Sequence, residues 1–220
     1  MNRQKPTVIL GDMMGSRHLP DRRRMVSRIR KVLAKVTDEL EAGTEGELFA
    51  ARPRLVKGID EMSAVMWEPS MAYRLCRLIN YRIAPNRIRF AIVSGNVDIG
   101  LDTGDASQMD GPAFHIAAEG IERARKRSDV YYIRCAEDQA ADRLLTVLAN
   151  MVHAAFERLS EHQRRATILY DELKDQRKVA RKMGITQQAV SDALRSAQYR
   201  LLASANEELD NYLCGLQTEA

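Results

Sequence analysis

Hydrophobic and polar positions follow two different patterns along the chain. Up to about residue 135, short apolar runs alternate with longer segments in which apolar residues recur every three or four positions, which predicts strands alternating with helices. The expected strands cover residues 7–10, 55–56, 62–67, 87–99 and 130–133. Helices are expected to begin at Pro20-Asp21, at the cap residue Ser70 and at Gly111-Pro112. From Glu137 onward only the helical spacing remains.

These elements define the expected fold class. Their order is β-α-β-β-α-β-α-β, and the first six have the ferredoxin-like arrangement, an antiparallel sheet with two helices on one face. We therefore expect an α+β fold followed by an all-α domain. The expected boundaries are 1–136 for the sheet domain, 137–158 for a connecting helix and 159–220 for the helical domain. Ser160 is expected to cap a helix of the last domain.

Residues 176–195, QRKVARKMGITQQAVSDALR, fit two short helices packed across a tight turn. Gly184 can adopt the positive φ of such a turn, and the Thr186 hydroxyl can cap the second helix. The residues expected to be buried between the helices are Val179, Ala180, Ile185, Val190 and Leu194. Small, apolar, glycine and cap requirements therefore hold together in the register of a helix-turn-helix. The second helix is expected to run on towards Leu213.

The outward face of the second helix carries the candidate DNA-binding residues. They are Thr186, Gln187, Gln188, Ser191, Asp192 and Arg195. Short polar side chains can reach base edges, and an arginine can contact guanine or phosphate, so we expect a double-stranded DNA partner. The competing interpretation is an ordinary αα-hairpin with a polar exposed face. Because one helix-turn-helix makes few contacts, we also expect a homodimer, with Leu201, Leu209 and Leu213 supplying an interface.

Composition narrows the class of protein. The hydrophobic fraction of 45% and the charged fraction of 29% over 220 residues are typical of a soluble globular protein. The net charge of +4 is compatible with a polyanionic partner without requiring one. The three cysteines are odd in number and far apart, which argues against a disulfide framework and fits a reducing cytoplasm. No apolar run approaches membrane-spanning length, so we expect a cytoplasmic protein without a membrane partner.

Four segments of the first domain carry a family resemblance. They are Gly11-Asp12-Met13-Met14-Gly15-Ser16-Arg17 after a strand, residues 57–61 (KGIDE) on a hairpin, residues 88–95 (IRFAIVSG) on a strand, and residues 111–114 (GPAF) at the start of a helix. Together they resemble the SatD family, which is itself similar to the class III nucleotide cyclases. The resemblance covers roughly residues 5–135. The rest of the chain separately resembles the fourth region of sigma factors.

The resemblance implies a metal site. Asp12 and Asp60 fall where two aspartates of the cyclase palm hold two Mg²⁺ ions, with Glu61 as a substitute ligand. Two carboxylates on adjoining strands repel each other without a cation, so their joint presence favours one. Alternatively, Asp12 is a turn residue and Asp60 is a polar hairpin tip. No cofactor is required by the sequence, and Mg²⁺ is the candidate that remains open.

Departures from the cyclase pattern favour an inactive palm. Where cyclases carry an asparagine and an arginine that stabilises the transferring phosphate, this chain has His115 and Glu119. A carboxylate has the wrong charge for that role. What remains is the binding of a ligand such as a nucleotide, with an anion cradle over residues 11–17. The candidate ligand-binding residues are Arg17, Lys57, Arg89 and His115.

Each of these residues also has a purely structural interpretation. Arg17 is also typical of a surface ion pair, Lys57 of a solvated strand end, and His115 of a buried histidine.

Three functions are therefore carried forward. The first is a DNA-binding transcriptional regulator whose catalytically inactive cyclase-like domain senses a ligand or mediates dimerisation. The second is a Mg²⁺-dependent nucleotidyl cyclase or transferase coupled to a DNA-binding module. The third is a helical domain that docks onto another protein. The polar face around Gln187 and Gln188 favours DNA over protein docking, because a protein-docking face is expected to be more apolar.

Overall fold

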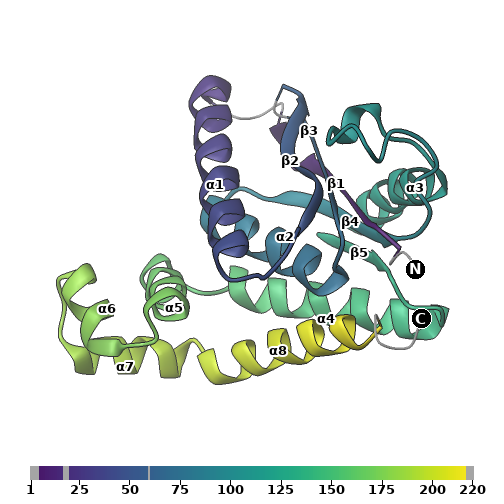
Figure 1. Ribbon diagram of the computed structural model, residues 1–220. Helices are drawn as coiled ribbons and strands as arrows, with labels where there is room; N and C mark the ends of the chain where they lie inside the picture. The colour runs from purple at the N-terminus through teal and green to yellow at the C-terminus, as the bar shows by residue number, and fades with distance from the viewer. Residues whose placement is uncertain (1–4, 17–19, 59, 217–220) are drawn as a thin grey trace. The chain divides into compact units, whose positions relative to one another are not determined.

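The computed structural model describes residues 5–16, 20–58 and 60–216 (Figure 1). The chain forms two compact units. Met1–Asn150 together with Leu209–Ala220 makes the sheet unit, and Met151–Glu208 makes the helical unit. Both divisions fall inside long helices, so the first turns of the helix expected over 137–158 belong with the sheet. Within the described residues, no helix is long and apolar enough to cross a membrane.

The sheet unit is built on five strands in the order β2-β3-β1-β4-β5. Their bounds are β1 Thr7–Met13, β2 Phe49–Lys57, β3 Glu61–Met66, β4 Ile88–Ser94 and β5 Tyr131–Arg134. The first four strands pair antiparallel, as expected, but β5 pairs parallel to β4. The expectation of an antiparallel sheet was therefore wrong for the last strand. A helical crossover between β4 and β5 returns the chain to the same end of the sheet, so β5 runs in the same direction as β4.

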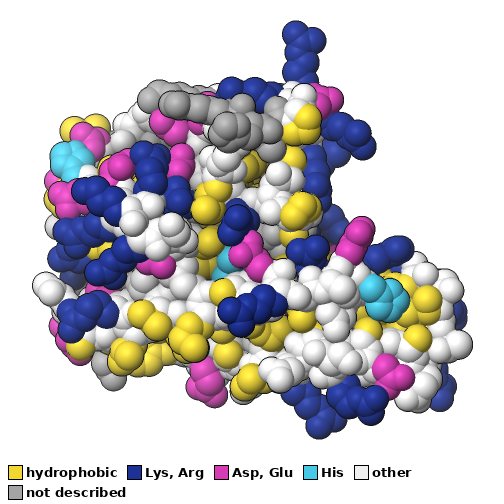
Figure 2. Space-filling view, turned by 180° about the vertical axis from the view of Figure 1, so that it is seen from behind, with side chains coloured by type: hydrophobic (Ala, Val, Ile, Leu, Met, Phe, Trp, Pro, Cys, Tyr) yellow, Lys and Arg dark blue, Asp and Glu magenta, His cyan; other side chains and the backbone are white. Residues whose placement is uncertain are grey.

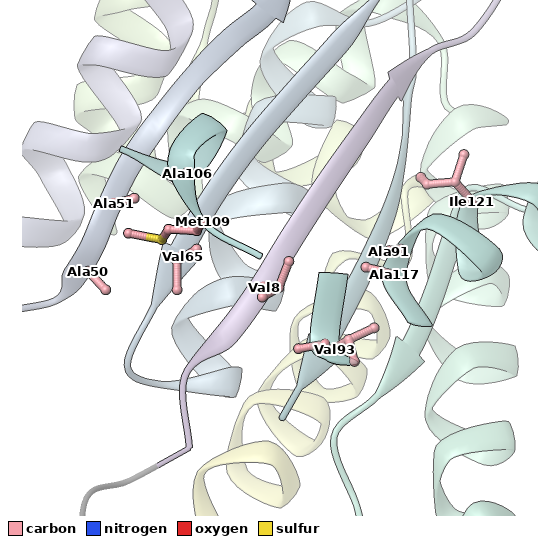
Figure 3. Packing of buried hydrophobic residues seen from close by; sticks show 11 residues of the cluster. Val8, Ala50, Ala51, Val65, Ala91, Val93, Ala106, Met109, Ala117 and Ile121 are labelled. Carbon is pink, nitrogen blue, oxygen red and sulfur yellow. The ribbon is translucent and has the colours of Figure 1, made fainter. Parts of the chain in front are cut away.

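Helices cover both faces of the sheet (Figure 1). Helices α1 (Arg22–Ala42) and α2 (Pro69–Ile83) pack on one face, and α3 (Pro112–Arg127) with the short helix η2 (Ala106–Gln108) packs on the other. The expected pair of helices on one face is α1 and α2. Figure 3 shows the core beneath α3, where small side chains such as Ala117 and Ala91 let the helix approach the strands closely. Gly120 extends this approach, because a Cβ there would lie 2.3 Å from the Tyr132 ring.

Several element boundaries differ from the expected ones. Strand β1 continues to Met13 because Asp12 has a partner on both neighbouring strands. Strand β4 ends at Ser94 and not at residue 99, because the following residues pair with the segment that precedes α3. Ser70 is not the cap of α2: Glu68 is the cap position, and it makes no side-chain cap hydrogen bond.

Helix α4 (Gln139–Glu157) closes the outer edge of the sheet. Its side chains Asp142, Thr146 and Asn150 follow one another at intervals of four residues and reach the backbone of β5 and its flanks. The Asn150 amide accepts from Tyr131 N at 3.0 Å and donates to Tyr131 O at 2.8 Å. The Thr146 hydroxyl accepts from Ile133 N at 3.0 Å and donates to Ile133 O at 3.2 Å.

These hydrogen bonds from Asp142, Thr146 and Asn150, called the α4 ladder below, extend beyond both ends of β5. Asn150 Oδ1 also accepts from Val130 N at 2.7 Å. Asp142 Oδ1 accepts from the amides of Cys135 and Ala136, each at 2.8 Å. Three polar side chains thus replace the neighbouring strand that an edge otherwise lacks.

The helical unit contains α5 (Glu161–Leu173), α6 (Gln176–Met183) and α7 (Gln187–Ser196), which surround one apolar core. The residues of this core are Ala166, Leu169, Val179, Ala180, Val190, Ala193 and Leu194. The burial expected for Val179, Ala180, Val190 and Leu194 is confirmed, as is the Ser160 cap, which forms a capping box with Gln163.

The last helix is interrupted, contrary to expectation. Helix α7 ends at Ser196, Gln198 has a φ of 50°, and α8 (Tyr199–Gly215) follows. Leu209 and Leu213 are fully buried. They therefore do not supply the expected surface for a homodimer, because neither side chain is exposed.

The α4 ladder generates a stability prediction. Replacing Asn150 by Leu removes the side-chain partner of three backbone groups around β5 and is expected to lower the free energy of unfolding by about 2–4 kcal/mol. Asn150→Asp retains the accepting oxygen and should lose less. Arg143→Ala on the exposed side of the same helix is the control. Urea unfolding measures all three, and equal stability of Asn150→Leu and Arg143→Ala would contradict the role of the ladder.

Asp142 generates a prediction about pH. Burial raises the pKa of its carboxyl, and the hydrogen bonds from Ala136 and Cys135 offset only part of this effect. A folded-state pKa above the unfolded value means that the native state binds the proton more tightly. The stability that this group contributes is therefore greatest below its unfolded pKa and is lost as pH rises through the folded pKa. Wild type should lose stability relative to Asp142→Asn as pH rises above the ordinary pKa of an aspartate, and the opposite trend in urea unfolding would contradict this.

Candidate functional site

The sequence-predicted residues Asp12 and Arg89 lie side by side at one end of the sheet. Asp12 on β1 is the register partner of Glu61 on β3 and of Arg89 on β4, so the three side chains share the face that α3 covers. Arg89 Nη1 donates to Asp12 Oδ2 at 2.8 Å. From α3, Arg125 Nη2 lies 3.3 Å from the same oxygen. Asp12 is thus the acidic centre of a cluster with two arginines.

Arg89 is held firmly in this position. Its side chain is only 7% exposed, and its Nε donates to the carbonyl of Asp129 at 3.1 Å. A buried guanidinium requires charged or polar partners, and here the Asp12 carboxylate and a backbone carbonyl provide them. The contacts of Arg89 are therefore directed at the protein itself, whereas the sequence suggested that Arg89 binds an anionic ligand.

Asp60 also has an arginine partner. It lies in the turn between β2 and β3, and Arg22 Nη2 at the start of α1 donates to its Oδ2 at 3.0 Å. The Asp60 carbonyl accepts from Met13 N at 3.0 Å, which holds the turn against the end of β1. Among residues 5–16, 20–58 and 60–216, no group of three or more His, Cys, Asp or Glu side chains is arranged to hold a metal ion.

Part of the segment expected to form an anion cradle belongs to the sheet and its turns. Gly11 and Asp12 belong to β1, and the amides of Met13 and Met14 donate to Asp60 O and Arg87 O. The backbone N–H groups of residues 11–14 are thus used by the sheet and its adjoining turns. Arg17 lies outside the described residues. Lys57 ends β2, but its side chain lies outside the described part of the chain.

His115 is exposed, which corrects the interpretation of a buried histidine. Its side chain is 72% exposed, and its Nε2 lies 3.1 Å from Asp110 Oδ1, which also accepts from Gly111 N. Gly111 has a φ of 153°, and a Cβ there would lie 2.8 Å from Asp98 N. The Asp110-Gly111-Pro112 segment therefore closes the preceding loop onto the start of α3. His115 lies beside this segment. Among the contacts of the described residues, it makes none with Asp12 or Arg89.

The second candidate site is the outward face of α7. The Thr186 hydroxyl accepts from Ala189 N at 3.1 Å, which confirms its cap role. Arg195 Nη2 donates to Asp192 Oδ1 at 2.5 Å, and Gln188 Nε2 donates to the same oxygen at 3.3 Å. Gln187, Gln188 and Arg195 are exposed, whereas Ser191 and Asp192 are half-buried. Asp192 thereby aligns a glutamine and an arginine in one row on the surface.

Helix α6 carries a group of basic residues that the sequence predictions did not include. Arg177, Lys178 and Arg181 are exposed, and the eight residues of this helix include no acidic one. Asp175 caps the helix through the amides of Lys178 and Arg177, and these hydrogen bonds lower the pKa of its carboxyl. The pattern was visible, because basic pairs at 177–178 and 181–182 flank the buried Val179 and Ala180.

Comparison with known families extends the resemblance to both units. The SatD family model matches residues 7–211. The match continues well beyond residue 135, so the sheet unit and helices α5–α7 fall within one family description. No curated protein matches the chain significantly.

The cluster around Asp12 generates a prediction. Arg89→Met leaves a largely buried carboxylate with only the exposed Arg125 beside it, so the free energy of unfolding should fall by about 2–4 kcal/mol. Adding Asp12→Asn to Arg89→Met should recover most of this loss. Arg125→Ala, which removes the exposed partner, should cost less than about 1 kcal/mol. Urea unfolding provides the measurement.

The same variants test the expectation of a metal. If Asp12 served mainly to bind Mg²⁺, the ion would raise the melting temperature of the wild type but not that of Asp12→Asn. Such a result, with no recovery in the Asp12→Asn/Arg89→Met double variant, would contradict the assignment of Asp12 to the arginine cluster.

Proposed function

We propose that this chain, which belongs to the SatD family, is a DNA-binding transcriptional regulator that reads double-stranded DNA with helix α7. The observation that carries the proposal is the division of α7 into two faces. Val190 and Leu194 are buried in the core of the helical unit, while Gln187, Gln188 and Arg195 project from it. In this proposal α6, the turn at Gly184 and α7 form a helix-turn-helix.

The row on α7 has the chemistry of base recognition. A glutamine amide can pair with adenine, and an arginine guanidinium with guanine, through two hydrogen bonds each. The ion pair between Arg195 and Asp192 is exposed, so exchanging it for a contact with DNA costs little. Gln188 and Arg195 lie about two turns apart along the helix, and both contact Asp192, so they lie on the same side of α7.

The basic residues of α6 supply the second kind of contact. In a helix-turn-helix the first helix crosses the DNA backbone, and its cations contact phosphates. Arg177, Lys178 and Arg181 are exposed on a helix without acidic residues, which suits this role. Sequence-independent affinity would then come from α6, and sequence selection from α7.

For the sheet unit we propose a cyclase-like palm that has lost its catalytic activity. It either senses a ligand such as a nucleotide or mediates dimerisation. The strand order around β1 and the positions of Asp12 and Asp60 support the palm. The arginine partners of both aspartates support the loss of catalysis, because guanidinium groups lie where cations would have to bind. Glu119 is exposed, and its Oε2 lies 3.5 Å from Nη2 of Arg123 on the same helix. The alternative, an active Mg²⁺-dependent cyclase or transferase, requires both carboxylates for the metal.

The proposal predicts two classes of variant. Gln188→Ala and Arg195→Ala should each weaken binding to the preferred duplex by about 1–3 kcal/mol and relax its sequence preference. Arg177→Ala and Lys178→Ala should weaken binding to all duplexes alike, and each should reduce the slope of log K against log salt by about one. The preferred duplex is first selected from a random library, and affinities are then measured over a range of salt concentrations.

Arg123→Ala is the matched control, because it removes an exposed arginine from the sheet unit. It should leave both the affinity and the salt dependence unchanged. Failure to enrich any sequence, or equal effects of Arg195→Ala and Arg123→Ala on binding, would contradict the proposed reading helix.

A further inference from the structure

Helix α4 carries apolar residues on its outward side as well as among its buried residues, which include Leu145 and Ala149. Asp142, Thr146 and Asn150 face the sheet, where they bind the backbone around β5. The outward side instead exposes large apolar side chains, of which Leu144 is 71% exposed and Met151 is 64% exposed. A helix that packs on a sheet and is otherwise solvated usually carries polar residues on its outward side. The exposed large apolar side chains indicate that this side is adapted to a partner.

The exposed apolar residues form one continuous stripe, the α4 stripe. It consists of Leu144, Val147, Leu148 and Met151. These four make up half of the eight large hydrophobic side chains that are exposed among the described residues, so they are not single scattered residues. Their spacing of three and four positions is that of a helix–helix seam. Figure 2 shows hydrophobic side chains gathered on the surface of α4.

We propose that the α4 stripe binds the α4 stripe of a second copy of this chain, with the two helices antiparallel about a twofold axis. The argument comes from the order of residues around the midpoint between Val147 and Leu148. An antiparallel pair centred there matches large with large, small with small and acidic with basic side chains. The matched pairs are Val147 with Leu148, Leu144 with Met151, Ala140 with Ala155, and Glu137 with Arg158.

The charges at the two ends favour this occupant and this orientation. Glu137 precedes α4 and Arg158 follows it, and both are exposed. In the antiparallel pair each glutamate meets an arginine of the other copy, whereas a parallel pair places like charges together at both ends. The antiparallel pair also brings opposite ends of the helix dipoles together. A twofold pair is closed, because the same patch is used on both copies.

The size of the stripe sets the expected strength of the pair. A single helix face is smaller than the roughly 800 Å² per partner of a standard protein interface. We therefore expect a weak dimer, with a dissociation constant on the order of micromolar. The pair requires neither DNA nor an intact α7, so it stands independently of the function proposed above.

Charge substitutions in the stripe test the pairing. Sedimentation of the full chain from about 1 to 100 µM without DNA should show a monomer–dimer equilibrium. Leu144→Lys should raise the dissociation constant by about tenfold or more, because a lysine then faces apolar Met151 of the other copy. Met151→Glu should do the same. Both side chains are largely exposed in the monomer, so the fold should be unaffected.

The double variant Leu144→Lys/Met151→Glu decides the orientation. In the antiparallel pair each lysine meets a glutamate of the other copy, so dimerisation should recover relative to either single variant. Leu144→Lys/Met151→Lys should remain monomeric, and Leu201→Lys, at an exposed leucine outside the stripe, should behave as wild type.

A wild type that stays monomeric at 100 µM, or single variants that dimerise unchanged, would overturn the proposal. Recovery with Leu144→Lys/Met151→Lys, or none with Leu144→Lys/Met151→Glu, would also overturn the antiparallel pair. A monomeric Leu144→Lys variant that still binds DNA would support the proposed role of α7, and it would show that DNA binding does not depend on the α4 pairing.

Discussion

The outer edge of β5 imposes the constraint on which much of the sheet unit depends. Backbone N–H and C=O groups at a sheet edge must find partners, and here three polar side chains of α4 provide them. Asp142, Thr146 and Asn150 can do so only if that side of the helix faces the strand. The apolar residues between them are then divided: Leu145 and Ala149 are buried, while Leu144 and Val147 are exposed. One requirement of hydrogen bonding thus fixes both the position of α4 and the character of its outer surface.

A second constraint is electrostatic. The end of β1 brings Asp12 between strands that carry Glu61 and Arg89, and a carboxylate in that position needs a positive partner. A metal ion and a guanidinium are two solutions of the same problem. The described contacts show the guanidinium solution twice, with Arg89 and Arg125 at Asp12 and with Arg22 at Asp60. The arginines therefore balance the charges of both carboxylates within the chain itself.

Local signals made much of the fold predictable from the sequence. The caps at Ser160 and Thr186 were predicted because each depends on residues within one turn. The break at Gln198 was not, because a positive φ at a residue other than glycine leaves little trace in the sequence. Leu209 and Leu213 show why tertiary contacts are harder to predict than helices. Helical spacing identifies an apolar face but does not tell which residues cover it. Asp12 and Arg89 were singled out separately, yet their pairing, 77 residues apart, depends on the register of the strands.

The two proposed surfaces complement each other energetically. A single reading helix supplies few contacts, and one stripe on α4 supplies a small interface, so each alone predicts weak association. If two copies bound adjacent half-sites, DNA would raise the effective concentration of one α4 stripe near the other, and pairing would do the same for the second α7. The occupancy of a two-site operator would therefore rise with protein concentration more steeply than the occupancy of one half-site. Because α4 and α7 are separate helices, charge changes in the stripe would alter this steepness while leaving the sequence preference of α7 unchanged.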